Sequence, residues 1–490
     1  MPDAYASQEG LMTDVINLIP STDGYKGVKS FKSLSTAVPD FSDDCYPQSA
    51  ETFILSDGNI VTVVGTDNNL YLRASGEDWE NVSKVEDGYT PGFRWKFALF
   101  GNLIIATNYN DPVQCLDLSD SDGKFTDLSA TAPNAHDLAI VNEFLVLVGT
   151  NDTYDGERPQ RIWWSPIGDP QGIWTPDQTT MCDYQDIFAG SYITGIVGGE
   201  DALILMRDAL VRMTFVGSPV VFQFQTVTTD FGNLGYSSYT HAEGSVFFLS
   251  SAGFKQYTNG SVESIGLGKV DSFIVSETDG TVVSDSVAAV DVRNSCVWWA
   301  YKDKTARDGN PNILTRTLVY HYPSKRWGKV HADIIAFCDV GTAGYTLDEL
   351  DQVNIHIDEL PYSLDSDAWK GGVPVLAAFS KDGKFGYFLG DLYDAELTTG
   401  VFPLSEAHDR NFVRRIRPRI DGAEATVQVA LAGMQEEISE PVFSSFVNKT
   451  RVGDFAFRVP GRFHKLKMKI TGVFNKVVGF LIDYDAAGEF

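Results

Sequence analysis

One pattern recurs along most of this chain: an apolar strand, a turn of a few polar or glycine residues, and a second apolar strand. The first example is FILSDGNIVTVVG from Phe53, and five more hairpins of this kind begin at Phe97, Leu138, Ile193, Tyr239 and Ala288. The Gly, Asn and Asp residues at the turn centres tolerate positive φ, which tight hairpin turns require. The pattern therefore predicts an all-β chain built from antiparallel hairpins.

Each hairpin is followed by two further strand candidates, so the repeating unit has four strands. The first unit continues with LYLRA and WENVS, and the third continues with RIWWS and with IWTPD around Trp174. Equivalent positions in successive units lie 41 to 58 residues apart, measured between Ile60, Ile104, Leu145, Leu203, Phe248 and Trp298. A four-stranded unit that repeats about every 40–50 residues is typical of a β-propeller, in which neighbouring blades cover each other's faces.

The sequence predicts six blades over about residues 51–332 and leaves a seventh open. The hairpin from Val375 is either a seventh blade or a set of closing strands, and the strand from Ile334 could belong with it. An array of β-sandwiches is the alternative fold. The propeller is expected to span residues 51–407, with an acidic insertion at about 346–367, and residues 1–50 form an extended arm that docks on the propeller or on a neighbour.

The C-terminal segment differs from the rest in charge. The whole chain has 38 Lys+Arg and 66 Asp+Glu, a net charge of −28, yet residues 408–482 hold 13 basic and 7 acidic residues, or +6. In HKLKMKI, the residues Lys465, Lys467 and Lys469 alternate with apolar ones, so one strand face is basic and the other apolar. We predict a separate β-sandwich module over residues 408–490 with a basic outer face.

Several classes of protein are disfavoured by composition. A strongly acidic chain is a poor free-standing nucleic-acid binder, because neutralising phosphates requires an excess of Lys and Arg. The five cysteines are far apart and form no C-x-x-C, so we expect buried free thiols. The longest apolar stretch, Leu138 to Gly149, contains Glu143 and is too short for a membrane span, and the acidic N-terminus has no signal-peptide core.

No motif for catalysis, cofactor binding or metal binding is found. The sequence contains no nucleophile elbow, phosphate-binding glycine loop or zinc-ligand spacing, so we expect no catalytic, cofactor-binding or metal-ligating residues. Glycosidases need only two carboxylates, and 66 acidic residues leave that class open. The adjacent tryptophans at 163–164 and 298–299 are interpreted as core residues and not as a sugar platform.

The C-terminal segment carries a further resemblance. It contains RRIRPRIDG (Arg414 to Gly422), then RVPGRFHKLKMKITG (Arg458 to Gly472), then KVVGFLIDY, and the N-terminal arm ends near GYKGVKSF (Gly24 to Phe31). With the hairpin repeat, these strands resemble the tail hub proteins of short-tailed bacteriophages, also called nozzle or packaged-DNA stabilisation proteins. Gly461, Arg462 and the alternation from His464 to Ile470 match the family's pattern. The likeness is detailed over roughly the last 80 residues, and the 346–367 insertion has no counterpart.

The resemblance implies a virion structural protein of the phage tail, assembled in the host cytoplasm, and not an enzyme. Such proteins form a ring, usually of six copies, below the portal and its adaptor protein. The ring continues the DNA channel as part of the head–tail connector. Double-stranded DNA passes through it at ejection without sequence-specific binding. A plug or needle closes the ring until then, and tailspikes or fibres dock nearby.

Charge gives this implied role a physical basis. An acidic wall repels DNA phosphates over a Debye length of about 8–10 Å, so packaged DNA would not adhere to it. The basic module then needs an acidic partner. We predict an interface with the adjacent subunit or the adaptor through Arg414, Arg415, Arg417, Arg419, Arg462, Lys465 and Lys467. The alternative is that these residues are only the solvated face of the module.

Two other functions remain open from the sequence. One is a carbohydrate-binding or glycoside-processing β-propeller, which requires a cleft with two carboxylates about 5–10 Å apart beside an exposed Trp. The other is an intracellular scaffold propeller, which predicts a monomer.

Overall fold

The computed structural model describes most of the chain: residues 12–39, 41–42, 45–55, 58–74, 78–120, 123–278, 285–304, 313–341, 350, 360–369, 374–405, 409–422 and 425–486. Across these ranges the elements are strands, one short α-helix, α1 (Asp271–Glu277), and the 3₁₀ turns η2 (Val292–Asn294) and η5 (Asp367–Trp369). None of the described helices is long and apolar enough to cross a membrane.

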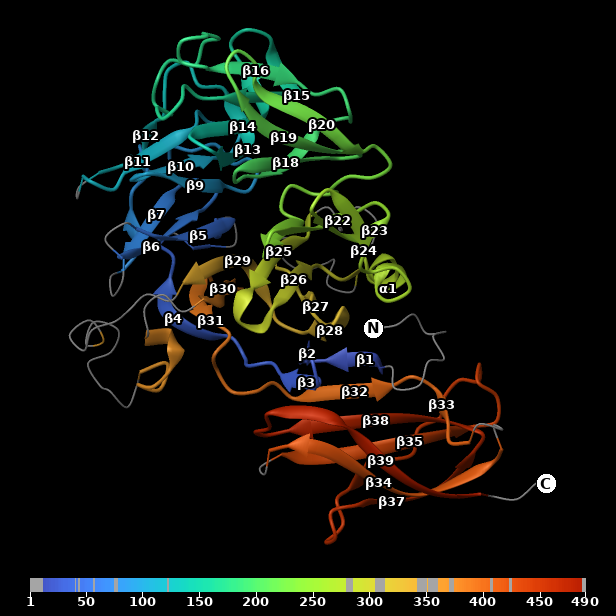
Figure 1. The fold of residues 1–490 in the computed structure, drawn as a ribbon. Coiled ribbons are helices and arrows are strands. Elements are labelled where there is room, and N and C mark those ends of the chain that lie inside the picture. Colours follow the sequence, from blue (N-terminus) through green and yellow to red (C-terminus); the bar gives the residue numbers. More distant parts are fainter. Residues whose placement is uncertain are drawn as a thin grey trace.

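Six antiparallel units of four strands follow one another in chain order (Figure 1). The first five are separate four-stranded sheets, and the sixth continues through β1 (Met12–Ile16) into a sheet of ten strands. The first two comprise β5 (Ser49–Ile54), β6 (Ile60–Gly65), β7 (Leu70–Ala74), β8 (Glu80–Asn81), and β9 (Lys96–Phe100), β10 (Leu103–Thr107), β11 (Gln114–Asp117), β12 (Thr126–Asp127). The next two comprise β13 (Asn134–Val141), β14 (Phe144–Asp152), β15 (Gly156–Trp164), β16 (Asp183–Asp186), and β17 (Ile193–Val197), β18 (Asp201–Met206), β19 (Leu210–Gly217), β20 (Val221–Thr228). The last two comprise β21 (Tyr239–Ala242), β22 (Ser245–Ser250), β23 (Gly253–Thr258), β24 (Ser261–Ser264), and β25 (Val287–Asp291), β26 (Cys296–Tyr301), β27 (Arg316–His321), β28 (Arg326–Val330).

The seventh sheet joins the two ends of the propeller sequence. It contains β29 (Ile334–Gly341), β30 (Pro374–Ser380), β31 (Lys384–Tyr387) and, as its outer strand, β4 (Lys32–Ala37) from the N-terminal segment. β29 packs against β5 of the first sheet, so the blades meet around the ring. The predicted propeller fold is confirmed, and the strands from Ile334 and Val375 form its seventh blade.

One local prediction is wrong, and another concerns residues that lie mostly outside the described ranges. The expected strand around Trp174 is a loop, and the fourth strand of that blade is β16. Pro176 has no N–H for a ladder, and Trp174 is instead buried beneath the loop, where its Nε1 donates to the Pro170 carbonyl at 2.9 Å. Most of the acidic insertion at 346–367 lies outside the described residues.

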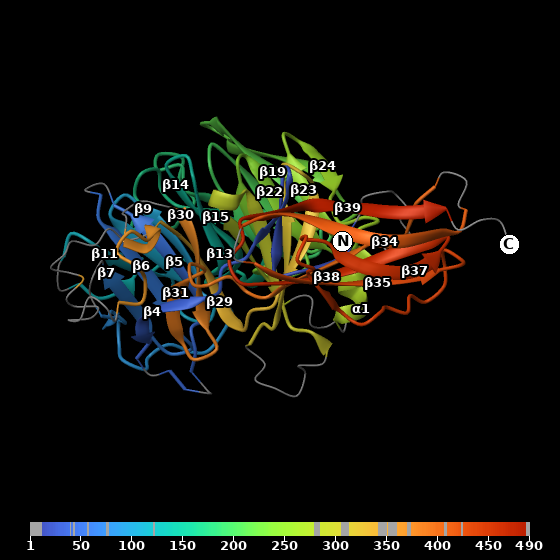
Figure 2. The ribbon, with the colours of Figure 1, turned by 90° about the horizontal axis from the view of Figure 1, so that it is seen from below.

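A two-layered β-sandwich stands beside the propeller (Figures 1 and 2). One layer comprises β32 (Ala395–Thr399), β33 (Phe402–Pro403), β35 (Thr426–Met434), β36 (Val447–Asn448) and β38 (Phe463–Thr471). The other comprises β34 (Asn411–Asp421), β37 (Phe455–Gly461) and β39 (Lys476–Ala486), extended by β2 (Leu18–Ser21) and β3 (Gly24–Gly27). The side chains of Leu466, Met468 and Ile470 are buried between the layers, and the lysines of β38 alternate with them, as predicted.

The N-terminal segment connects the two parts of the molecule. β1 (Met12–Ile16) pairs with β32 of the sandwich and meets β28 of the sixth blade at a single parallel bridge between Ile16 and Lys329. β3 pairs with β39, and β4 then completes the seventh blade. The expected arm therefore forms strands with both the propeller and the sandwich of its own chain.

Candidate functional site

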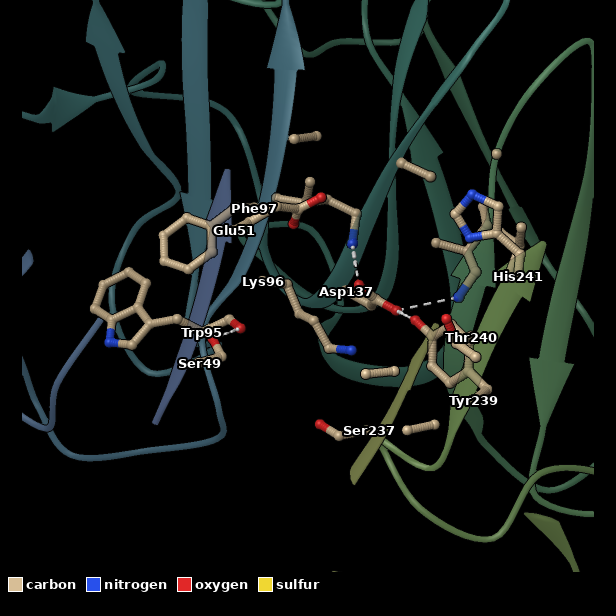
Figure 3. A pocket seen from close by; sticks show the side chains of 18 of the residues that line it. Ser49, Glu51, Trp95, Lys96, Phe97, Asp137, Ser237, Tyr239, Thr240 and His241 are labelled. Atoms are coloured by element: carbon tan, nitrogen blue, oxygen red, sulfur yellow. Dashed lines mark hydrogen bonds between the residues drawn. The ribbon is translucent and has the colours of Figure 1, made fainter. Parts of the chain in front are cut away.

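The seven innermost strands of the blades, β5, β9, β13, β17, β21, β25 and β29, surround a central pocket of about 380 Å³. Every one of these strands contributes lining residues, so the pocket is the axial cavity of the propeller. Its charged and ionisable side chains are Glu51, Lys96, Asp137, Tyr239 and His241, and Figure 3 shows them around the cavity.

Asp137 is the most enclosed acidic group of the central pocket. It lies on β13 and is only 3 % exposed. Its Oδ1 accepts the Leu138 N–H at 2.9 Å, and its Oδ2 accepts the Ile196 N–H at 3.1 Å and the Tyr239 hydroxyl. Burial raises the pKa of the Asp137 carboxyl, against the lowering effect of Lys96 and these hydrogen bonds. The carboxyl thus links three consecutive blades through β13, β17 and β21.

Tyr239 and Lys96 approach one another across the pocket. The Lys96 ammonium lies 4.8 Å from the centre of the Tyr239 ring, within the range of a cation–π contact. The ring also lies against Gly195 of β17, where an added Cβ would come within 2.4 Å of a ring carbon. Burial and the neighbouring Asp137 raise the pKa of Tyr239 well above its usual value, so the phenol stays a hydrogen-bond donor.

Aromatic rings gather next to the pocket, at the end where the inner strands begin. His136 stacks on Tyr109 with ring centres 3.8 Å apart, and Tyr236 and Phe93 pack against it at 4.9 and 4.2 Å. His136 is 7 % exposed, and burial lowers its pKa to about 4. The imidazole is therefore a neutral member of an aromatic cluster at physiological pH.

Metal binding depends on clustered ligand side chains, and carbohydrate processing in a β-propeller would need an exposed Trp. Across the residues that the structure describes, no group of three or more His, Cys, Asp or Glu side chains is placed to hold a metal ion. All nine tryptophans are buried, none more than 7 % exposed, so the pairs at 163–164 and 298–299 are core residues as predicted. The exposed Trp that a sugar platform would need is not present.

The predicted interface residues lie on the sandwich, and four of them pair with acids of the same chain. Arg415 contacts Asp483 at 2.7 Å, Arg417 contacts Asp454 at 2.6 Å, and Arg414 and Lys467 pair with Asp485 and Glu396. Lys465 is half-buried, and burial lowers its pKa. Arg419 and Arg462 are exposed and form no ion pair with any described residue. The last two therefore have the charges most available to a partner.

Sequence reasoning missed the central pocket residues. Lys96, Asp137 and Tyr239 come from three blades, and no local motif joins them. One signal was present: Asp137 directly precedes the apolar run LAIV of its strand, and a carboxyl in a buried strand must find donors.

Comparisons with known proteins give no family. No family model and no curated protein matches the chain. Two solved structures share part of its shape: the computationally designed Ika8 protein and virginiamycin B lyase from Staphylococcus aureus. Both have a TM-score of 0.36. Ika8 is 10 % identical, with 78 % of this chain and 97 % of its own covered. The lyase is 11 % identical, with 73 % of this chain and 99 % of its own covered. At this distance neither is evidence of what this chain binds or does.

Proposed function

We propose that the chain is a structural subunit of a phage tail hub, without enzymatic activity, that assembles into a ring of about six copies in the virion. In this role it would sit below the portal-adaptor protein, retain packaged DNA and let it leave at ejection. A plug or needle and tailspike or fibre proteins would be its other neighbours. The observation that carries the proposal is the separation of charge, +6 in residues 408–482 against −34 in the remainder.

The outer face of β34 and β39 has the composition of a subunit interface. Arg415, Arg417 and Arg419 point outward from β34, and beside them Val478 and Leu481 of β39 are 50 % and 53 % exposed. Arginine is enriched at interfaces relative to the rest of a protein surface, and exposed aliphatic side chains gain free energy when a partner covers them. Closed rings use head-to-tail contacts, so this face would meet a different, acidic surface of the next copy.

The path of DNA in this proposal lies between subunits. The central pocket of about 380 Å³ is far too small for a duplex whose major groove alone is about 12 Å wide. The lumen would therefore be enclosed by the ring of copies, with acidic surface of the propellers facing the phosphates.

The carbohydrate alternative gains no support from the site. It required two carboxylates about 5–10 Å apart beside an exposed Trp, whereas every Trp is buried.

The native mass of the purified protein tests the proposal. Mass photometry over a range of concentrations is expected to show a species near 320 kDa, six times 53.9 kDa, which decreases as salt is added. Negative-stain images of that species should show a ring with an open centre. A protein that stays at 53.9 kDa at every concentration and salt level contradicts self-assembly and favours the monomeric scaffold.

A further inference from the structure

We infer that the central pocket is a binding site for a small oxyanion with a single negative charge, held by Lys96. The inference is independent of the ring proposal, because the pocket lies within one chain. The acid and the base of the pocket, Asp137 and Lys96, differ in how far their hydrogen-bonding groups have partners.

The acid of the site already has its partners. The two oxygens of Asp137 accept from Leu138 N, Ile196 N and the Tyr239 hydroxyl. Such a carboxyl has little capacity left for a hydrogen bond from Lys96. Lys96 acts on it only through the field at longer range.

The base of the site lacks acceptors. Within the described ranges the Lys96 ammonium makes a ring contact with Tyr239 but no hydrogen bond and no ion pair. The Ser237 hydroxyl and the His241 ring line the same pocket and likewise have no side-chain hydrogen bond there. An ammonium with three donors in a confined cavity needs acceptor oxygens, from water or from a ligand.

The Lys96 side chain has one defined contact in the pocket, with the Tyr239 ring. Its ammonium lies over the Tyr239 ring, and the Tyr239 hydroxyl is hydrogen-bonded to Asp137 (Figure 3). The ring also lies close against Gly195. A donor held in one position loses less freedom when it binds a ligand. The position of the Lys96 ammonium is therefore preorganised for binding a ligand.

Chemistry and size define the ligand. An ammonium in a pocket that a hydroxyl and an imidazole also line favours an oxyanion, because charge-assisted hydrogen bonds are the stronger kind. Glu51 lines the pocket from the neighbouring strand, which disfavours a multiply charged ligand. A pocket of about 380 Å³ is at the small end of ligand sites, so we expect a metabolite-sized carboxylate or dihydrogen phosphate.

Calorimetric titration of the full chain with acetate, benzoate and, at pH 6, inorganic phosphate tests the site. At least one probe should bind with 1:1 stoichiometry, and the stronger class of probe distinguishes carboxylate from phosphate. Lys96→Met is expected to weaken binding at least tenfold. Lys84→Met removes the same charge from an exposed pair with Asp127 outside the pocket and should bind like the wild type.

A second measurement covers the case in which Lys96→Met does not fold. Crystals of the wild-type chain soaked in iodide should show an anomalous peak within contact distance of the Lys96 ammonium. The inference is wrong if no probe binds the wild type at 1:1 stoichiometry, if folded Lys96→Met binds as well as wild type, or if iodide occupies other positions only.

Discussion

Replacing Tyr239 with phenylalanine removes the hydroxyl that donates to the buried Asp137 carboxyl and leaves the ring in place on Gly195. A buried carboxyl that loses one donor costs about 1–3 kcal/mol of unfolding free energy. We expect Tyr239→Phe to show that loss in guanidinium unfolding. Tyr154→Phe, at an exposed position, is the control and should stay within about 0.5 kcal/mol of wild type.

His136 predicts a pH dependence with a definite sign. Burial lowers its folded-state pKa to about 4, against about 6.5 in an unfolded chain. As pH falls from 6.5 to 4 the unfolded state takes up a proton first, so stability is lost across that window, by up to about 3 kcal/mol. His136→Phe keeps a ring between Tyr109 and Tyr236 and removes the contribution of His136 to the pH dependence of stability. The melting temperatures at pH 7 and pH 5 should differ less for the variant than for the wild type. An equal difference in both proteins would contradict the lowered pKa of His136.

At the scale of single elements, β4 closes the seventh blade, and one glycine of β31 makes room for it. A Cβ at Gly386 would come within 2.1 Å of the Lys32 carbonyl of β4. Gly386→Val should therefore displace β4, lower the melting temperature by several degrees and expose residues 32–37 to protease. Lys384→Val, on the same strand with an exposed side chain, should melt like the wild type and resist cleavage.

The alternation on β38 gives a second test within one strand. Met468 is fully buried in the sandwich, whereas the neighbouring Lys467 points outward to Glu396. Met468→Lys puts an unpaired charge in the core and should cost more than about 3 kcal/mol. Lys467→Met removes a partly exposed ion pair and should cost less than about 1 kcal/mol. Chemical unfolding of the two variants compares them directly, and equal losses would mean that the strand faces are wrongly assigned.

The hairpins, β38 and β4 show which parts of the fold can be predicted from sequence. The hairpins and the two faces of β38 are local patterns, and each was predicted from its own residues. The pairing of β4 with β31 joins Ser33 to Gly386, and nothing in either segment specifies the other. The central pocket is harder still, because Lys96, Asp137 and Tyr239 meet only after the ring of blades has closed. Sequence therefore predicts blades well, but not how the seventh is completed or what lies on the axis.

For the whole molecule, Arg419 and Arg462 offer the cleanest test of the proposed subunit contact. Reversing Arg415, Arg417 or Lys467 would also break ion pairs within the sandwich, so a lost ring could reflect a damaged module. Arg419 and Arg462 are exposed and pair with no described residue, so reversing them changes the outer charge with little effect on folding.

The double variant Arg419→Glu/Arg462→Glu should reduce the 320 kDa species at least tenfold at 0.15 M salt, because like charges then face each other across the contact. Lys124→Glu/Lys381→Glu makes the same charge change at two exposed propeller lysines and should leave the ring intact. If the wild type forms rings and both variants do too, the copies touch elsewhere than the basic face. If both variants lose the ring, net charge and not the sandwich face controls assembly. The location of the contact is thereby tested separately from the existence of the ring.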